Sequence, residues 1–203
     1  MPNVFLYSDP HFGHKNICRF TRNDGVTKMR PWDDVEVMNE DLITLYNDKV
    51  RPNDVCYFLG DVIWSRKYLD ILARLNGTKI LIRGNHDTCF VDEYLKYFTE
   101  IKSYEFIDAL LLSHIPVHPE SIGRCGTNVH GHLHANRVMK PCGFDSDTGK
   151  VLYGNEIDVR YHNVCVEMTE FSPILIEDVL TRIQEEGGEI NFRQVDYRAP
   201  QPL

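Results

Sequence analysis

The segment VFLYSDPHFGH, residues 4–14, decides how the chain folds. Its first part, residues 4–8, is an apolar run of the length expected for a short buried strand. The run passes directly into Asp9, Pro10 and His11, and the first and last of these have side chains that bind metal ions. The segment therefore predicts a strand that delivers metal ligands at its carboxyl end.

Four later apolar runs end in the same way, each followed at once by polar side chains of the metal-binding type. They are VCYFL (55–59) before Asp61, KILI (79–82) before Asn85, ALLL (109–112) before His114, and TNV (127–129) before His132 and His134. In α/β sheets, ligands collect outside the carboxyl ends of the strands. We therefore expect the five clusters to converge on one site, although they lie far apart in the sequence.

The converging side chains offer oxygen and imidazole ligands and no thiolate. They are Asp9, His11, Asp61, Asn85, His114, His132 and His134. Such a set suits Mn, Fe, Ni, Co or Zn better than a cysteine-based structural zinc site. Seven groups exceed the four of a closed structural site, and they match two metals that share a bridging carboxylate.

The chain has nine histidines, and not all are expected to be ligands. His14 follows His11 by three residues, and it either approaches the substrate from the rim of the site or is a solvated loop residue. His118 and His162 are expected to be ordinary surface, core or supporting residues. The role of His130 stays open, although it alternates with His132 and His134 and would share their side of an extended segment.

The segments between the apolar runs predict helices over residues 38–50, 66–75, 91–98 and 173–185, the last with Ser172 as its N-cap. A further strand is expected over residues 163–168, and residues 135–158 read as a loop or an irregular hairpin. Alternating strands and helices indicate an α/β fold with a mixed sheet. We expect one domain over residues 1–203, whose last strand, helix and polar tail occupy residues 160–203.

The formal net charge of −8 over 203 residues argues against a protein that coats nucleic acid. It leaves a phosphate-bearing substrate open, because two bound divalent ions would make the pocket locally positive. The six cysteines are dispersed, and neither a signal peptide nor a membrane-length apolar stretch is evident. We therefore expect a cytoplasmic protein with reduced thiols and no membrane partner.

The motifs DPH, GD, GNHD, a single H and GHLH, in that order over residues 9–134, resemble those of the calcineurin-like metallophosphoesterase family. The run NVCVE, residues 163–167, also resembles a strand of small bacterial and phage members. The resemblance implies a four-layer α-β-β-α sandwich of two mixed sheets with flanking helices.

The same resemblance implies a role for each site residue. Asp9, His11 and His134 would hold one metal, Asn85, His114 and His132 would hold the other, and Asp61 would bridge both. His86 would reach the phosphoryl oxygen or the leaving group, and Asp87 would either orient His86 or stabilise the turn. Two divalent ions are implied, with Mn expected and Fe, Ni, Co, Zn or Mg as alternatives. A metal-bridging hydroxide would then attack phosphorus in line.

Departures from the family narrow the expected substrate. Protein phosphatases of this family carry GDxxDRG and GNHE, whereas this chain has GDVIWSR (60–66) and GNHD (84–87), which argues against phosphoproteins. We expect a phosphodiesterase acting on small or nucleotide-like molecules, with His14, Arg83 and Arg124 as candidate substrate contacts. The alternatives are a nuclease or nucleic-acid end-processing phosphatase of the same fold, and a non-catalytic metal-binding scaffold. The sequence does not indicate the oligomeric state.

Overall fold

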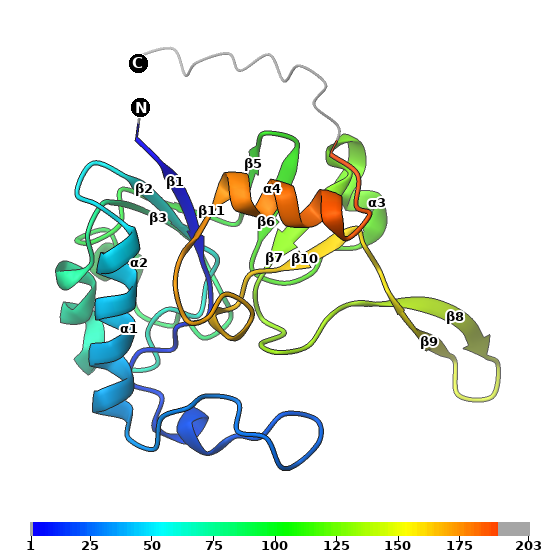
Figure 1. The fold of residues 1–203 in the computed structure, drawn as a ribbon, viewed down its shortest axis with the longest axis horizontal. Coiled ribbons are helices and arrows are strands. Elements are labelled where there is room, and N and C mark those ends of the chain that lie inside the picture. The colour runs from blue at the N-terminus through cyan, green and yellow to red at the C-terminus, as the bar shows by residue number, and fades with distance from the viewer. Residues whose placement is uncertain (1, 191–203) are drawn as a thin grey trace.

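Two sheets stacked face to face form the centre of the molecule, and helices flank them (Figure 1). The structure is a computed structural model that describes residues 2–190, apart from the side chain of Arg124. The first sheet has the strand order β11-β1-β2-β3-β4. Its strands are β1 (Val4–Tyr7), β2 (Val55–Phe58), β3 (Thr78–Ile82), β4 (Glu100–Lys102) and β11 (Ile174–Leu175). Strands β1 to β4 are parallel, and β11 is antiparallel to β1.

The second sheet has the order β10-β7-β6-β5. Its strands are β5 (Tyr104–Ile107), β6 (Leu110–Ser113), β7 (Thr127–His130) and β10 (Tyr161–Asn163). β6, β7 and β10 are parallel, and β5 is an antiparallel edge strand. Two mixed sheets with flanking helices confirm the predicted α/β class.

Alternation along the strands sorts side chains between the layers. Phe5 and Tyr7 of β1 are buried in a cluster with residues of helix α1, whereas Leu6 is buried in a cluster with residues of the second sheet. Leu110 and Leu112 join that inter-sheet cluster, and Leu111 packs in a third cluster on the opposite face. Each sheet is therefore covered on both faces, which explains why its strands read as continuous apolar runs.

The helices occupy the outer layers. They are α1 (Val35–Lys49), α2 (Val91–Tyr94), α3 (Pro119–Ile122) and α4 (Ile176–Glu185), with 3₁₀ segments at Lys15–Arg19, Arg66–Arg74, Gly123–Cys125 and Val166–Met168. The carboxylate of Asp34 caps α1 by accepting the amides of Glu36 and Val37. Within residues 2–190, none of the helices combines the length and the apolar character that crossing a bilayer requires.

Four predicted elements differ from the structure. The helix predicted over residues 91–98 is shorter and ends at Tyr94. Residues 66–75 form 3₁₀ turns over Arg66–Arg74 instead of an α-helix. The strand predicted over residues 163–168 ends at Asn163, and Val166–Met168 turn into a 3₁₀ segment. The last helix begins at Ile176 and not at Pro173, and no side chain caps it. The reason is that Ile174–Leu175 pair with β1, so the chain is still extended where Ser172 was expected to cap a helix.

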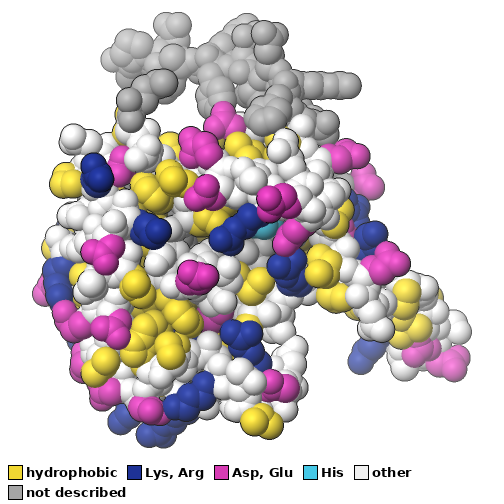
Figure 2. Space-filling view, viewed as in Figure 1, with side chains coloured by type: hydrophobic (Ala, Val, Ile, Leu, Met, Phe, Trp, Pro, Cys, Tyr) yellow, Lys and Arg dark blue, Asp and Glu magenta, His cyan; other side chains and the backbone are white. Residues whose placement is uncertain are grey.

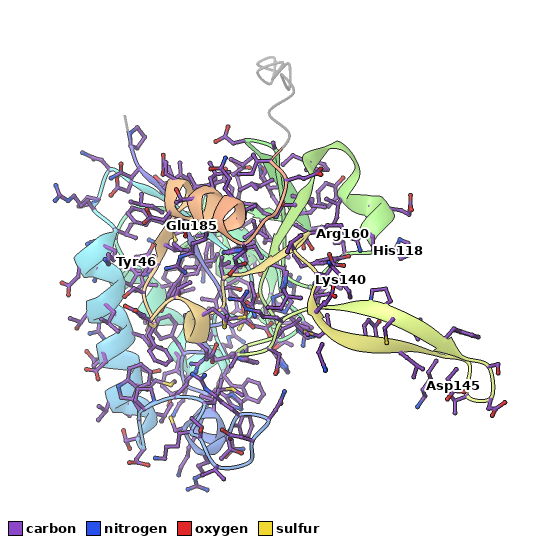
Figure 3. All side chains as sticks on the ribbon, turned by 45° about the vertical axis from the view of Figure 1, so that its right-hand side comes forward. Tyr46, His118, Lys140, Asp145, Arg160 and Glu185 are labelled. Atoms are coloured by element: carbon purple, nitrogen blue, oxygen red, sulfur yellow. The ribbon has the colours of Figure 1, made fainter. Side chains whose placement is uncertain are left out.

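Strands β8 (Met139–Asp145) and β9 (Lys150–Ile157) form a hairpin that projects from the body (Figures 1 and 2). The sequence predicts either a loop or an irregular hairpin in this segment, and the structure has the hairpin. Asp145 lies near its tip and Lys140 near its base (Figure 3). Apolar side chains of the hairpin are exposed, including Phe144 at 66% and Tyr153 at 64%. Residues 139–157 contribute nothing to the core clusters found in residues 2–190.

Because the hairpin buries no core residue, its removal should not destabilise the body. Its two ends already meet, since the amide of Asp158 donates to the carbonyl of Val138 at 2.9 Å. We predict that replacing residues 140–156 with an Asn-Gly turn changes the free energy of unfolding by less than about 1 kcal/mol. Urea unfolding followed by circular dichroism measures this. A loss of several kcal/mol would show that the hairpin supports the fold.

Candidate functional site

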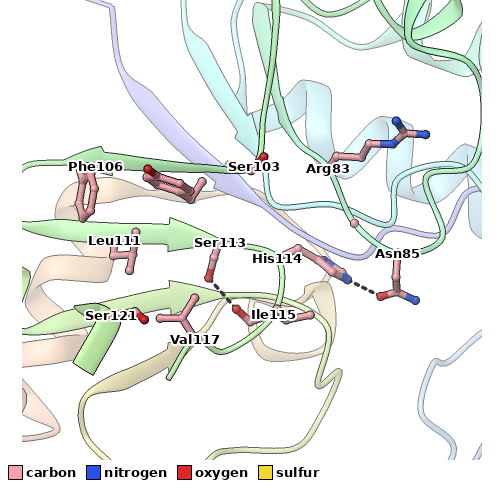
Figure 4. A pocket seen from close by; sticks show the side chains of 12 residues that line it. Arg83, Asn85, Ser103, Phe106, Leu111, Ser113, His114, Ile115, Val117 and Ser121 are labelled. Carbon is pink, nitrogen blue, oxygen red and sulfur yellow. Dashed lines mark hydrogen bonds between the residues drawn. The ribbon is translucent and has the colours of Figure 1, made fainter. Parts of the chain in front are cut away.

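The carboxyl ends of five strands, β1, β2 and β3 of one sheet and β6 and β7 of the other, lead into loops that carry the seven predicted ligands. Six of them form two groups, in each of which the candidate ligand atoms lie within 4.8 Å of one another. The first cluster is Asp9, His11 and His134, and the second cluster is Asp61, His114 and His132. Asn85 adjoins the second cluster, with its Oδ1 2.9 Å from Nε2 of His114 (Figure 4). The convergence expected from the strand ends is therefore present.

Five of these side chains stand on backbone in the left-handed region. The φ angles are 57° for Asp9, 51° for His11, 52° for Asp61, 67° for His132 and 50° for His134. Residues with a Cβ adopt this conformation rarely, and it concentrates at functional sites. Hydrogen bonds between loops hold it in place: the amide of Asp9 donates to Gly60 O, and that of His11 to Asp61 O, both at 3.1 Å.

Two glycines leave room for the site carboxylates. A Cβ on Gly84 would lie 2.3 Å from Oδ1 of Asp61, and a Cβ on Gly131 would lie 2.3 Å from Oδ2 of Asp9. Both distances are far inside van der Waals contact. The glycines of the GNHD and GHLH motifs are therefore needed because the carboxylates press against the backbone at these points.

Asp61 belongs to the second cluster and also faces the first. Its Oδ1 accepts the amide of His86 at 2.8 Å. Its Oδ2 is 3.7 Å from Nε2 of His11, in the first cluster, and 3.5 Å from Nε2 of His114, in the second. One oxygen is thus fixed by the backbone, and the other faces an imidazole of each cluster.

Asp9 is fixed in a similar way. Its Oδ2 accepts the hydroxyl of Ser8 at 2.6 Å and the amide of His132 at 2.9 Å. Its Oδ1 is buried without a hydrogen-bond partner. Burial alone would raise the pKa of Asp9, but the neighbouring histidines, His11 foremost, hold it below its usual range. The carboxylate is therefore ionised, and its Oδ1 is available to bind a ligand.

Several buried polar atoms of the site fit a cation. Both ring nitrogens of His11 lack a hydrogen-bond partner, as does Oδ1 of Asp9. When His114 is neutral, its Nδ1–H donates to Leu59 O at 2.7 Å, which leaves the lone pair of Nε2 facing Asn85 Oδ1. Two lone pairs 2.9 Å apart need a proton or a cation between them. Oxygen and imidazole donors with unused lone pairs, most of them buried, suit divalent metal ions.

A buried ion pair supports the first cluster from behind. Nδ1 of His134 donates to Oε1 of Glu167 at 3.1 Å, so its Nε2 is left for a ligand. Arg30, 1% exposed, donates to Glu167 at 2.8 Å and to the carbonyls of Asp9 at 2.6 Å and Pro10 at 2.7 Å. Burial would raise the pKa of Glu167, but Arg30 holds it below its usual range. No motif points to Arg30, whereas Glu167 lies in the NVCVE run.

The hydrogen bonds of Asp87 do not match the orienting role considered for it. Its carboxylate accepts the amides of Asp61 at 2.8 Å, Val62 at 2.9 Å and Gly84 at 2.8 Å. These bonds support the alternative, in which Asp87 stabilises the loops. Arg83 stabilises the same loop, because its guanidinium donates to the carbonyls of Asp87 and Cys89.

His14 does not line an exposed rim. It is 6% exposed, and its ring is stacked on that of Trp64 with 3.6 Å between the centroids. Burial lowers its pKa to about 4. Trp64, which the sequence did not single out, also lies beside His86, with 4.9 Å between the rings. The side chain of Arg124, the third candidate substrate contact, lies outside the described part of the structure.

The remaining histidines lie outside the two clusters. Nδ1 of His118 accepts the amide of Glu120 at the start of α3, and His162 faces Glu186 at 3.5 Å. His130 is buried, and its Nδ1 donates to the carbonyl of Gly131 at 2.8 Å. None of the three belongs to either group of candidate ligands in residues 2–190.

Comparison with known proteins assigns the fold and site to a class. Residues 2–140 match the calcineurin-like phosphoesterase family, which is more than half of the chain. The chain belongs to this family and is a metal-dependent phosphoesterase, whose divalent ions the two clusters could hold.

Two relatives of unknown function cover nearly the whole chain. An uncharacterized protein of Methanocaldococcus jannaschii is 33% identical over 191 residues, which cover 92% of this chain and 94% of that protein. A crystal structure of a protein of unknown function from Aquifex aeolicus superposes with a TM-score of 0.61 at 26% identity, covering 90% of this chain and 100% of that one. The similarity extends well beyond the segment that carries the motifs, so the fold is shared as a whole.

The ion pair of Arg30 should be essential for stability. Removing one partner of a buried pair leaves an unpaired charge, so we predict that Arg30→Met lowers the free energy of unfolding by about 3–5 kcal/mol. The matched control is Arg74→Met, which breaks the exposed pair with Glu40 and should leave the urea midpoint unchanged. Equal midpoints for both variants would contradict the role given to Arg30.

Proposed function

We propose that the protein is a phosphodiesterase that acts on small or nucleotide-like substrates with two divalent metal ions. Asp9, His11 and His134 would hold one ion, Asn85, His114 and His132 the other, and Asp61 would bridge them. Mn is the proposed metal. The observation that carries this proposal is the position of Asp61 Oδ2, 3.7 Å and 3.5 Å from imidazole nitrogens of the two clusters.

When bound, the two ions supply a nucleophile near neutral pH and neutralise charge on the phosphoryl oxygens. The residues of the chain position the ions and supply a proton. Asp61 keeps both clusters in register, because the amide of His86 fixes the other oxygen of its carboxylate. His86 is exposed beside the site, with its ring 5.7 Å from that of His11. A ring nitrogen of His86 can therefore donate a proton to the departing ester oxygen.

Two features argue against macromolecular substrates. The run GDVIWSR lacks the Asp-Arg pair of protein phosphatases, and Trp64 of that run instead packs against His14 and His86. The net charge of −8 disfavours long nucleic acids. Small phosphoesters meet both conditions, and among them we propose diesters or nucleotide-like molecules.

Metal content and turnover test the proposal. We predict close to two divalent ions per chain, and hydrolysis of bis-p-nitrophenyl phosphate with added Mn that disappears after treatment with a chelator. A panel of cyclic nucleotides, diesters, monoesters and oligonucleotides, run with Mn and with Ni, identifies the preferred class. Less than one bound ion together with no turnover under any metal would reject the enzyme in favour of a scaffold. A clear preference for oligonucleotides would favour the nuclease alternative.

Two substitutions separate the proposed roles. Asp61→Asn should weaken binding of both ions and abolish turnover, because it removes a negative charge that both share. His86→Ala should retain the metals and lower kcat by about 10²- to 10⁴-fold, the usual contribution of a general acid. His118→Ala, at the start of α3, is the control and should change neither. Metal analysis and steady-state kinetics measure the effects. Loss of metal in His86→Ala would contradict its role.

A further inference from the structure

A cavity of about 770 Å³ opens directly from the second cluster. Asn85 and His114 belong both to its lining and to the site, and from them the cavity extends along β5 and β6 of the second sheet (Figure 4). Its volume is within the range that holds a small organic ligand. We call this cavity the aromatic groove, because Tyr104 and Phe106 line it.

The aromatic side chains share one face of an edge strand. Tyr104 and Phe106 are two residues apart on β5, so they project to the same side, and their rings are 5.6 Å apart at an interplanar angle of 76°. They are 57% and 40% exposed, and Ile115, which also lines the groove, is 51% exposed. A concave surface of this kind, next to polar catalytic side chains, is a site for an apolar ring.

The charge of the groove also differs from that of the protein. None of the residues lining it is Asp or Glu, although the chain carries a net charge of −8. The charged residue in the lining is Arg83, whose guanidinium donates to the carbonyls of Asp87 and Cys89. Its side chain points away from Phe106 and Leu111 (Figure 4). An anionic phosphoester therefore meets no carboxylate in the groove, and an attached ring meets aromatic and aliphatic side chains.

We propose that the aromatic groove binds a planar aromatic ester substituent of the substrate, of the size of a nucleobase. The proposal rests on the phosphodiesterase function proposed above, and it assigns Tyr104 and Phe106 as specificity-determining residues. With the phosphoryl group at the metal site beside Asn85 and His114, one ester arm enters the groove. Stacking on a protein aromatic tolerates any base, so the groove selects for an aromatic ring and not for a particular sequence.

The test is the double variant Tyr104→Ala/Phe106→Ala, assayed on thymidine 5′-(p-nitrophenyl phosphate) and on methyl p-nitrophenyl phosphate. We expect KM to rise about tenfold, the usual loss when stacking is removed, while kcat changes less than twofold. A rise in KM for the thymidine ester alone places the nucleoside in the groove. A rise in KM for both esters places the p-nitrophenyl leaving group there. Unchanged KM for both, or a fall in kcat alone, would overturn the proposal. The matched control is Phe144→Ala/Tyr153→Ala on the hairpin, which removes one phenylalanine and one tyrosine ring, both exposed and outside the groove, and should leave KM unchanged.

A binding measurement without metal separates this proposal from the proposed function. Chelator-treated protein should quench the fluorescence of 2-aminopurine riboside 5′-monophosphate, and AMP should displace the probe, whereas ribose 5-phosphate should not. The Tyr104→Ala/Phe106→Ala variant should bind about tenfold more weakly. If the native protein hydrolyses no diester but this difference persists, the proposed function fails and the groove assignment stands. Equal affinity in both proteins, or displacement by ribose 5-phosphate, would overturn the groove assignment.

Discussion

The left-handed backbone at the strand ends is the constraint on which the site depends. A strand that continues straight would carry its next side chains to alternate faces of the sheet. By turning at Asp9, Asp61 and His132, the chain instead directs ligands from both sheets to one point. The conformation costs about 1–2 kcal/mol for each residue with a Cβ. It persists because hydrogen bonds between loops, and the sheets behind them, leave no relaxed alternative.

This constraint explains why the motifs contain glycine. The backbone of Gly131 passes close to the Asp9 carboxylate, and the backbone of Gly84 passes close to the Asp61 carboxylate. A side chain at either glycine would collide with the carboxylate. Backbone amides of the same two motifs hold the carboxylates in place. The amide of His132 donates to Asp9, and the amide of His86 donates to Asp61. The GNHD and GHLH motifs thus supply candidate ligands and, through the amides of His86 and His132, also anchor a carboxylate that another strand delivers.

The sequence was informative where a side chain's role follows from its place at a strand end. The convergence of the candidate ligands on one site could be predicted from the strand ends, because ligands collect at the carboxyl ends of strands in α/β sheets. Their division into two groups was implied only by the family resemblance. The role of Arg30 could not, since it depends on Glu167, 137 positions away, and on burial that no local pattern encodes. His14 was misplaced because Trp64 covers it from a distant loop. The cap expected at Ser172 was wrong because pairing of Ile174–Leu175 with β1 outweighed a local helix signal.

The electrostatics of the site follow from the same packing. Asp9, Asp61 and Glu167 are brought together in the interior, where ionised carboxylates are costly unless they are paired. Arg30 compensates Glu167 and two backbone carbonyls, and it makes no contact with the Asp9 or Asp61 carboxylate. The negative charge that Arg30 does not compensate is therefore that of the Asp9 and Asp61 carboxylates, which lie in the two clusters. A cation bound there offsets the cost of gathering these groups, so binding of the ions and stability of the loops are coupled. An acidic protein can thus present a site for a phosphate ester, because the carboxylates of Asp9 and Asp61 are buried where a cation would bind and no Asp or Glu lines the adjoining groove.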